Sequence, residues 1–575
     1  MSRTTIRLRA RNTCVPVSDS IELVTFDVLI TGGWVVDGTG APAFRADVGI
    51  VGGHVRALGR LSETTTEAET TEAETTEAET TAAAASAAVT ARAAVTASAT
   101  PIEAETVIDA SGRYVLPGLI DCHAHGDAVV FDQEIQLAAL RQGVTTLVLG
   151  QDGLSFAPTR SVAALDYARR YFAAVNGAHP GIDGPVSVAE LLAGYDRATA
   201  LNTAYLLPHG TIRFDVMGPA ERAADPGELC AMRAVIETGL SEGAAGLSTG
   251  LEYVPGRYAD ADELAHLCQA LGALPYVTHM RGYGASAPTG MAEVVAIAER
   301  SRAAVHVSHY HGPASTLLPL VEDARRRGVD LSFDSYPYLR SSTILAMVTL
   351  PAWVPAADTD HAVSLLGSEH VRLAREWAGL GDLWPRITLS HAPGFEWAEG
   401  MTLPAAAANQ GMEPAEFCRI LLMETRLEAG CVAARPDEGP EGERSVREIL
   451  QDPAHTGGSD GIYVGGHPHP RGFGAFARYL GRHVRELGDL TWEQAAVHLA
   501  SHPARRFGLP DRGLVRRGQI ADLIIVDPLR VADTATYENP RALAVGVDDV
   551  LVSGVPVLRG GRLTGETPGR ALRPA

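Results

Sequence analysis

Two patterns of hydrophobic residues alternate along most of this chain. Between residues 115 and 499, short apolar runs typical of buried strands are separated by segments whose apolar residues recur at helical spacing. The predicted strands are residues 116–121, 145–149, 204–208, 244–248, 276–278, 304–307, 330–333 and 454–457. Strands that alternate with helices predict a parallel sheet, so the pattern predicts an α/β protein with a TIM-like (β/α)8 barrel over residues 116–504.

The helical segments include residues 228–242 and 260–271, which carry apolar residues at helical spacing. The stretch before the eighth strand is too long for one loop and contains helical patterns at 360–378 and 414–427. We therefore predict a helical insertion over residues 350–450.

Both ends of the chain carry a different pattern. Short β-branched runs near Val28, Trp34 and Val48 are separated by glycine-rich turns, and similar runs return at 521–527 and 550–557. Residues 26–115 and 505–575 are predicted to form one small β-sandwich domain made from both chain ends. Residues 1–25 are predicted to be a loose tail.

A low-complexity run interrupts the first part of this β-domain. Residues 62–101 are rich in Thr, Ala and Glu, and the sequence Thr-Thr-Glu-Ala-Glu occurs three times from Thr65 to Glu79. Too few large apolar groups are present to offset the entropy of ordering, so a disordered insertion is predicted.

Composition narrows the functional classes. The chain has 575 residues and a net charge of −21, which opposes nucleic-acid binding. No apolar run is long enough for a membrane span. All basic side chains other than histidine are arginine, because the chain contains no lysine, which excludes lysine Schiff bases and carboxylated-lysine metal bridges. Six scattered cysteines and the absence of an apolar leader favour the reducing cytoplasm.

Candidate chemistry begins at the end of the first predicted barrel strand. His123 and His125 are two residues apart, and alternate side chains of an extended strand face the same side, so both imidazoles can meet one cation. Further polar residues follow other strands: Asp152, His209, Glu252, His279, His309, Asp334 and Asp460. The carboxyl ends of barrel strands meet at one mouth, so these groups predict a site for zinc or a related divalent ion.

Several motifs together resemble the amidohydrolase superfamily and, more closely, the N-acyl-D-amino-acid deacylases, also called D-aminoacylases. These motifs are Gly118-Leu-Ile-Asp-Cys-His-Ala-His, Gly246-Leu-Ser-Thr-Gly-Leu-Glu-Tyr-Val-Pro-Gly, Thr278-His-Met-Arg, Asp334-Ser-Tyr-Pro-Tyr, His467-Pro-His-Pro-Arg and Gly518-Gln-Ile-Ala-Asp-Leu-Ile-Ile-Val-Asp. The resemblance covers roughly residues 27–528 apart from the low-complexity insertion.

The resemblance implies zinc-dependent hydrolysis of the linear amide of an N-acyl-D-amino acid, with one or two zinc ions. Asp460 matches the catalytic aspartate, which takes a proton from the attacking water and returns it to the departing nitrogen. The implied metal ligands are His123, His125, Asp152, His279, His309 and Asp460.

Two positions depart from the family pattern. Asp152 stands where the family has a metal-binding cysteine, and His311 stands where it commonly has a lysine that contacts the substrate carboxylate. A carboxylate can also bind zinc, so the site is retained. The expected contacts to a small-molecule substrate with a carboxylate are Arg281, His311, Tyr336, Tyr338 and Arg471.

Two alternatives remain. One is a hydrolase of cyclic amides, of the hydantoin or dihydroorotate type, on the same barrel, although such relatives generally bridge two metals with a carboxylated lysine. The other is a non-catalytic amidohydrolase-like scaffold protein, which the complete set of four histidines and Asp460 disfavours. The acyl group, the amino-acid side chain and the oligomeric state are not determined by the sequence.

Overall fold

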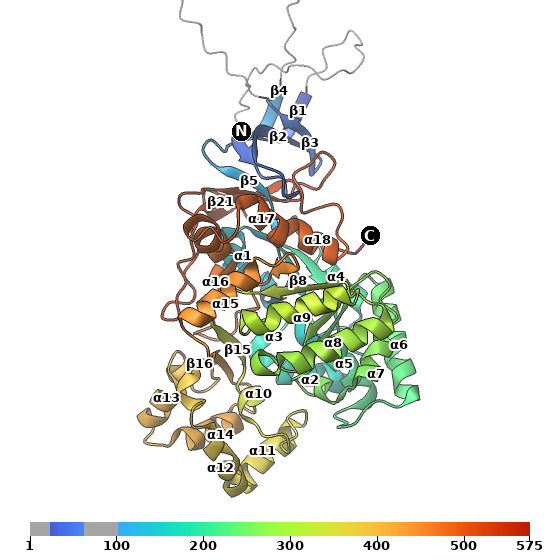
Figure 1. The fold of residues 1–575 in the computed structure, drawn as a ribbon, viewed down its shortest axis with the longest axis vertical. Helices are drawn as coiled ribbons and strands as arrows, with labels where there is room; N and C mark the ends of the chain where they lie inside the picture. The colour runs from blue at the N-terminus through green and yellow to red at the C-terminus, as the bar shows by residue number, and fades with distance from the viewer. Residues whose placement is uncertain (1–23, 62–101) are drawn as a thin grey trace, which may run out of the picture.

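The computed structural model describes residues 24–61 and 102–575 (Figure 1). Strands from the two ends of the chain form one nine-stranded sheet at the top of this view. Its strands are β1 (Val24–Val35), β2 (Phe44–Val51), β3 (His54–Gly59), β4 (Ile102–Asp109), β5 (Tyr114–Pro117), β20 (Leu523–Val526), β21 (Val547–Val552), β22 (Val555–Arg559) and β23 (Arg562–Leu563). The ends join where β20 pairs with β5 in antiparallel fashion.

The central strands are parallel and alternate with helices, as predicted. They are β6 (Leu119–Asp121), β7 (Ala124–His125), β8 (Val144–Leu149), β9 (Asn202–Tyr205), β10 (Leu207–Pro208), β11 (Leu247–Gly250), β12 (Tyr276–His279), β13 (Val305–Val307), β14 (Leu331–Ser335), β18 (His455–Gly457) and β19 (Gly461–Ile462). Three hydrogen-bonded ladders connect them: β6-β8-β9, then β10-β11-β12-β13-β14-β18, and the pair β19-β7.

The ladders are separate because the first, third and eighth central strands are interrupted. The first is divided into β6 and β7 by residues 122–123, the third into β9 and β10 by Leu206, and the eighth into β18 and β19 by residues 458–460. Two of these interruptions contain candidate site residues, His123 and Asp460. Backbone that leaves the ladder at a strand end is free to direct its side chains toward a site.

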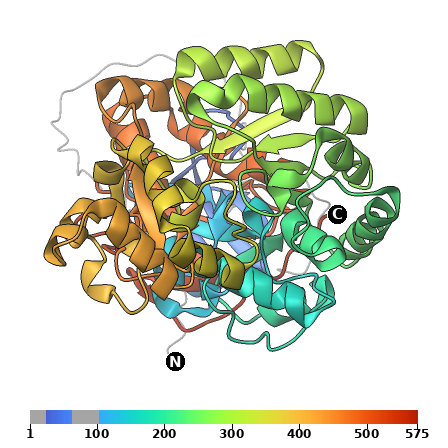
Figure 2. The ribbon, with the colours of Figure 1, turned by 90° about the horizontal axis from the view of Figure 1, so that it is seen from below.

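Helices surround the central strands, as the view from below shows (Figure 2). They include α1 (Gln133–Arg141), α2 (Val162–Tyr171), α4 (Val188–Tyr195), α5 (His209–Met217), α6 (Pro226–Ser241), α7 (Ala261–Cys268), α8 (Ala287–Ser301), α9 (Ala314–Arg326), α15 (Pro440–Leu450) and α16 (Arg471–Arg478). The predicted helix at 228–242 corresponds to α6, which begins at Pro226 because Asp225 and Glu228 form a capping box. The helix predicted at 260–271 corresponds to α7, capped by Asp260.

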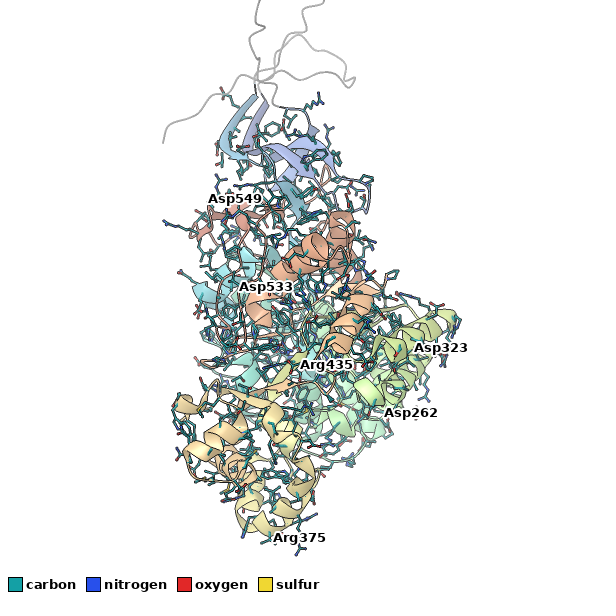
Figure 3. The ribbon with its side chains drawn as sticks, turned by 60° about the vertical axis from the view of Figure 1, so that its left-hand side comes forward. Asp262, Asp323, Arg375, Arg435, Asp533 and Asp549 are labelled. Carbon is teal, nitrogen blue, oxygen red and sulfur yellow. The ribbon has the colours of Figure 1, made fainter. Side chains whose placement is uncertain are left out.

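The segment before the eighth strand contains the predicted helices and a sheet that the helical pattern did not predict. Its helices are α10 (Leu345–Thr349), α11 (Thr359–Ser368), α12 (His370–Trp377), α13 (Leu403–Asn409) and α14 (Pro414–Glu424). Strands β15 (Arg340–Ile344), β16 (Ile387–His391) and β17 (Gly430–Ala434) pair antiparallel in the order β15-β17-β16. A separate apolar cluster that includes Leu345, Trp377 and Phe417 packs this segment. Arg375 marks its outer end (Figure 3).

Some sequence predictions concern residues outside the described ranges. The low-complexity insertion and most of the predicted tail belong there, although β1 already begins at Val24. Among the described residues, no helix is long and apolar enough to cross a membrane. The five described cysteines are unpaired thiols: Cys122, Cys230, Cys268, Cys418 and Cys431.

Candidate metal centre

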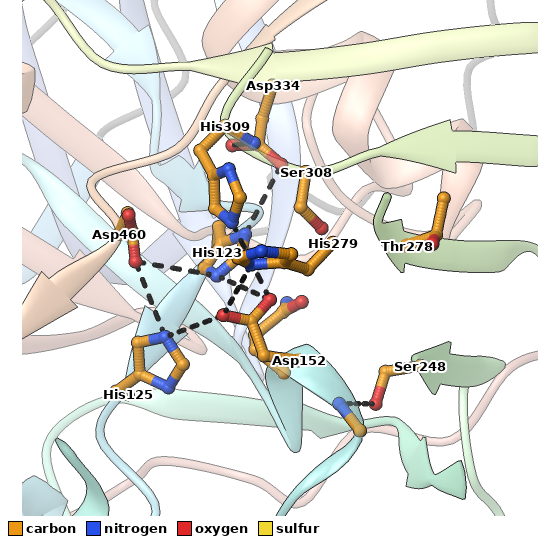
Figure 4. A network of polar contacts seen from close by, with 12 residues as sticks. His123, His125, Asp152, Ser248, Thr278, His279, Ser308, His309, Asp334 and Asp460 are labelled. Atoms are coloured by element: carbon orange, nitrogen blue, oxygen red, sulfur yellow. Dashed lines mark hydrogen bonds and ion pairs between the residues drawn. The ribbon is translucent and has the colours of Figure 1, made fainter. Parts of the chain in front are cut away.

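Four histidines and two aspartates from five segments converge at one end of the parallel strands (Figure 4). They are His123, His125, Asp152, His279, His309 and Asp460, and each is at most 6% exposed. His123 and His125 follow β6, Asp152 follows β8, His279 ends β12, His309 follows β13 and Asp460 precedes β19. The structure therefore brings together all six residues that the resemblance implied as metal ligands.

Asp152 lies at the centre of this group. Its Oδ1 atom is 3.6 Å from Nε2 of His123 and 3.7 Å from Nε2 of His309. Its Oδ2 atom is 3.7 Å from Nε2 of His125 and 3.5 Å from Nδ1 of His279. The carboxylate of Asp152 is thus within reach of all four imidazoles.

Asp460 lies beside His123 and His125 on another side of the group. Its Oδ1 atom is 3.3 Å from Nε2 of His125 and 3.6 Å from Nε2 of His123. Its Oδ2 atom is 2.7 Å from Nη2 of Arg471. The two oxygens therefore face different partners, one toward the histidines and one toward the guanidinium.

These separations fit a coordination shell better than a hydrogen-bonded cluster. Most exceed hydrogen-bond length, whereas ligands at about 2.0–2.1 Å from a tetrahedral zinc ion lie about 3.3 Å apart. Four buried atoms here have no hydrogen-bond partner among the described residues: Nδ1 and Nε2 of His123, Oδ1 of Asp152 and Nδ1 of His279. Buried polar atoms are normally satisfied, so these residues fit a divalent metal ion such as zinc.

The electrostatics of the group also favour a cation. Burial alone would lower the pKa of His123, but Asp334, Asp152 and Asp460 raise it to about 9. Burial opposes protonation of His279 in the same way, while Asp152 and Glu252 raise its pKa to about 10. The surrounding imidazoles hold the pKa of Asp152 well below its ordinary value despite burial. The carboxylates create a negative potential that protons or a divalent cation can neutralise.

Backbone strain is concentrated at the same residues. Asp152, His309 and Asp460 have φ values of 55°, 35° and 50°, in the left-handed region that side chains rarely adopt. Such conformations cost about 1–3 kcal/mol each and persist where the surrounding structure imposes them. Gly250 helps to impose the first, because a Cβ atom there would lie 2.2 Å from the carbonyl oxygen of Asp152.

Neighbouring polar groups orient the histidines. Nε2 of His279 lies 2.9 Å from the Glu252 carboxylate, which leaves Nδ1 facing Asp152. Nδ1 of His125 lies 3.3 Å from the side-chain oxygen of Asn176, so its Nε2 faces the cluster. Asp334 accepts a hydrogen bond from the backbone N–H of His309 and lies 3.5 Å from Nδ1 of His123. Such partners fix the ring orientation and tautomer of metal-binding histidines.

The five expected substrate contacts are placed differently. His311 and Tyr336 line a cavity of about 290 Å³ beside the cluster. Nδ1 of His311 lies 2.7 Å from the carbonyl oxygen of His309, and its ring stacks on Tyr283. Arg471 is fully buried and does not line this cavity, and its guanidinium lies 4.5 Å from the centre of the Tyr336 ring, which does.

Arg281 and Tyr338 do not line this cavity, which corrects the sequence prediction. The guanidinium of Arg281 donates to the carbonyl oxygens of Arg257 and Ala259 and to the carboxylate of Glu293, so packing contacts occupy it. Tyr338 lies against Arg478 and lines a neighbouring pocket. Tyr336 and Tyr338 are two positions apart, but the chain turns after β14, and only the first faces the metal cluster.

Several cavity residues were not predicted from the sequence. Ser341, Ser342 and Thr343 of β15, with Met347 and Val348 of α10, form the part of its wall contributed by the insertion. No motif identifies them, because only the folding of the insertion brings them beside the barrel. The supporting carboxylate of Asp334 had a recognisable signal, since it follows the seventh strand within a matching motif.

Comparisons with known proteins agree with this geometry. The model of the amidohydrolase family matches residues 106–558. An N-acyl-D-glutamate deacylase of Alcaligenes xylosoxydans xylosoxydans is 32% identical over 95% of this chain and 96% of its own length. A D-aminoacylase of the same organism is 30% identical over 95% of this chain and 97% of its own length.

The similarity extends to three dimensions. A crystal structure of N-acyl-D-glutamate deacylase from Bordetella bronchiseptica superimposes with a TM-score of 0.75 and 30% identity, covering 96% of this chain and all of the other. That protein was crystallised with zinc and a phosphonate inhibitor that mimics the tetrahedral intermediate of its reaction.

Proposed function

Because this chain belongs to the amidohydrolase family and, within it, to the N-acyl-D-amino-acid deacylases, we propose that it hydrolyses N-acyl-D-amino acids to a carboxylate and a free D-amino acid in a zinc-dependent reaction. These matches confirm the family relationship that the sequence motifs indicated. One observation of the site carries the proposal: six buried ligand-type side chains converge with the spacing of a coordination shell, and four of their atoms have no hydrogen-bond partner among the described residues.

The ligand atoms divide into two overlapping sets. His123, His125 and Asp460 would hold one zinc ion, and His123, Asp152 and His309 form the second set, with His279 beside Asp152. Asp152 lies near histidines of both sets. Its carboxylate would therefore be a ligand whether the site holds one ion or two. Bound zinc supplies a Lewis acid, which polarises a carbonyl oxygen and lowers the pKa of water to about 7.

Asp460 is the proposed proton carrier. Burial by itself would raise the pKa of this carboxyl group, but Arg471 and the neighbouring histidines hold it well below the ordinary value, so the group is ionised at neutral pH. Its Oδ1 atom faces the cluster and would accept the proton of the attacking water. The same atom would return the proton to the amide nitrogen as the carbon–nitrogen bond breaks.

Arg471 remains the proposed partner of the substrate carboxylate. Its Nε and Nη1 atoms are buried and have no hydrogen-bond partner among the described residues. Either donor can form a charge-assisted hydrogen bond with one oxygen of a carboxylate. The guanidinium lies behind Tyr336 and Asp460, which line the cavity, so the proposed contact needs local rearrangement when the substrate binds. His311 and Tyr336 remain proposed contacts from the cavity wall.

The finer architecture is also a proposal. If the interrupted strands are treated as single strands, the parallel pairings run in the order one to eight, and β19 returns to β7 of the first strand. Two backbone hydrogen bonds support this closure, from Cys122 N to the oxygen of Gly457 and from Asp460 N to the oxygen of His123. We propose a closed (β/α)8 barrel over 116–504, a β-sandwich from both chain ends and a cytoplasmic location.

A substrate panel tests the proposed activity. Zinc-loaded protein is incubated with N-acetyl-D- and N-acetyl-L-amino acids and with cyclic amides, and free amine or ring opening is measured. Release of amine from D substrates is expected. Hydrolysis confined to L substrates or to cyclic amides would contradict the proposal, and complete inactivity with bound zinc would favour a non-catalytic scaffold.

One variant tests whether Asp460 carries the proton without being required for zinc binding. Asp460→Asn is expected to lower kcat by at least about 1000-fold, because the amide cannot accept a proton. Zinc content, measured by atomic absorption, is expected to stay close to that of the wild type because the four histidines and Asp152 remain. A near-normal rate in this variant would place the proton carrier elsewhere.

A further inference from the structure

The cavity beside the metal cluster contains little positive charge to meet an acidic substrate side chain. Outside the six proposed ligands, Glu252 is the charged side chain among the described residues that line it. No arginine lines it, and the chain contains no lysine. The position where the family commonly has a lysine is occupied by His311, whose Nδ1 atom contacts the carbonyl oxygen of His309.

The arginines nearest this cavity already have partners. Arg435 binds Asp437 through two nitrogens, at 2.9 and 2.5 Å. The guanidinium of Arg281 donates hydrogen bonds to the carbonyl oxygens of Arg257 and Ala259. Arg471 is paired with Asp460 through Nη2, and its remaining unpaired donors are assigned to the α-carboxylate that every N-acyl-amino acid carries.

Apolar groups form another part of the wall. Met347 and Val348 extend from α10, and both are partly exposed beside the cavity. Val175 and Ile462 are buried behind the same space. These side chains offer contact area and no hydrogen-bond donors, which suits an apolar group of the substrate.

We propose that the side-chain subsite of this enzyme is apolar and that its substrates are N-acyl derivatives of D-amino acids with uncharged, apolar side chains. This inference rests on the proposed deacylase function. A glutamate or aspartate side chain would be a second carboxylate near Glu252 and without a cation, and burial of an unpaired charge is strongly unfavourable. The chain is similarly related to a D-aminoacylase and to an N-acyl-D-glutamate deacylase, so overall identity does not distinguish the two classes.

The first test compares side chains at constant acyl group. The kcat/KM values of the zinc-loaded protein are measured for N-acetyl-D-methionine, N-acetyl-D-leucine, N-acetyl-D-glutamate and N-acetyl-D-aspartate. The apolar pair is expected to exceed the acidic pair by about 100-fold or more. Equal or better hydrolysis of the acidic pair would overturn this inference and leave the deacylase function intact. Inactivity toward all N-acyl-D-amino acids would overturn both.

The second test introduces a cation into the apolar wall. In Met347→Arg, the ratio of kcat/KM for N-acetyl-D-glutamate to that for N-acetyl-D-methionine is expected to rise by about 10-fold or more. Met412→Arg is the matched control, because Met412 belongs to the same insertion but lies at the surface, 38% exposed and outside the cavity. Circular dichroism verifies that both variants are folded. An unchanged ratio in folded Met347→Arg would contradict the assignment of this wall to the substrate side chain.

Discussion

Nη2 of Arg471 lies 2.7 Å from Oδ2 of Asp460, and both side chains are buried. The ion pair fixes the carboxylate so that its other oxygen faces His123 and His125. A buried guanidinium that was expected only to bind substrate therefore also holds the proposed proton carrier in its ionised form.

Replacement of this arginine tests the second role. Arg471→Met is expected to lower kcat by about 100-fold and to raise KM, because Asp460 loses its partner and the substrate carboxylate loses its anchor. The pKa of Asp460 rises without the guanidinium, so the acidic limb of the kcat–pH profile should shift to higher pH. Removal of one member of a buried pair also costs about 3–5 kcal/mol of stability, which thermal unfolding measures.

Arg478→Met provides the control for that experiment. Arg478 is another arginine of α16, but it pairs with Asp533 on the side of the neighbouring pocket. Its replacement should leave the pH profile unchanged. An unshifted acidic limb in Arg471→Met would show that the pair does not set the ionisation of Asp460.

Asp152 offers a test of the substituted ligand. In Asp152→Asn the carboxylate charge is lost, and zinc affinity measured by competition with a chelator should fall by about 100-fold. Asp152→Cys should retain affinity within about 10-fold of the wild type, because a thiolate is also a zinc ligand. Asp262→Asn, on the outer surface of α7, is the control (Figure 3). Unchanged affinity in Asp152→Asn would exclude this residue from the metal shell.

Glu252 is expected to act through His279. Its carboxylate accepts the Nε2 hydrogen of that ring, which leaves Nδ1 free to bind metal. Glu252→Gln should weaken zinc binding by about 10–100-fold, the usual effect of losing such a partner. The exposed Glu237→Gln on α6 should have no effect. Equal chelator competition curves for the Glu252 variant and the wild type would assign Glu252 a different role.

Zinc binding should release protons. In the metal-free protein the pKa values of His123 and His279 are raised to about 9 and about 10, so both rings carry protons at pH 7.5, whereas metal-binding imidazoles are neutral. Affinity should therefore rise with pH up to about these values. Calorimetric titration in buffers of different ionisation enthalpy measures the number of protons released, and about two are expected. A value near zero would mean that the rings are neutral before zinc binds.

Chelation tests the dependence on zinc as a whole. Dialysis against a strong chelator is expected to abolish amide hydrolysis, and added zinc should restore it. Metal-free protein should also unfold at a lower temperature, because a ligand that binds only the folded state stabilises it. Full activity without bound metal would contradict the zinc-dependent mechanism.

Local sequence was sufficient for much of the site because each ligand lies next to a strand with a clear apolar pattern. His123 and His125 follow the first central strand, and His279 and His309 end or follow two others. Since parallel strands align their carboxyl ends, the convergence of these side chains follows from strand order alone. Asp152 and Asp460 were predicted for the same reason, although their left-handed backbone was not.

Contacts between distant segments could not be predicted in this way. The apolar wall at Met347 and Val348 depends on how the insertion folds back through β15 and α10, and no short-range pattern encodes that path. The different directions of Tyr336 and Tyr338 depend on the turn after β14. The pairing of Arg471 with Asp460 joins the start of α16 to the loop between β18 and β19, and the side-chain rotamers there are set by packing.

The sequence by itself determined the alternating α/β pattern, the participation of both chain ends in β-structure and the position of the candidate metal ligands at the ends of strands, because these depend on periodicity and on position along each strand. Only the tertiary structure decided that Asp152 lies among all four histidines, that hydrogen bonds occupy the guanidinium of Arg281 and that apolar side chains of α10 line one part of the cavity. Distances between side chains on different strands are fixed by long-range packing, which local sequence patterns do not specify.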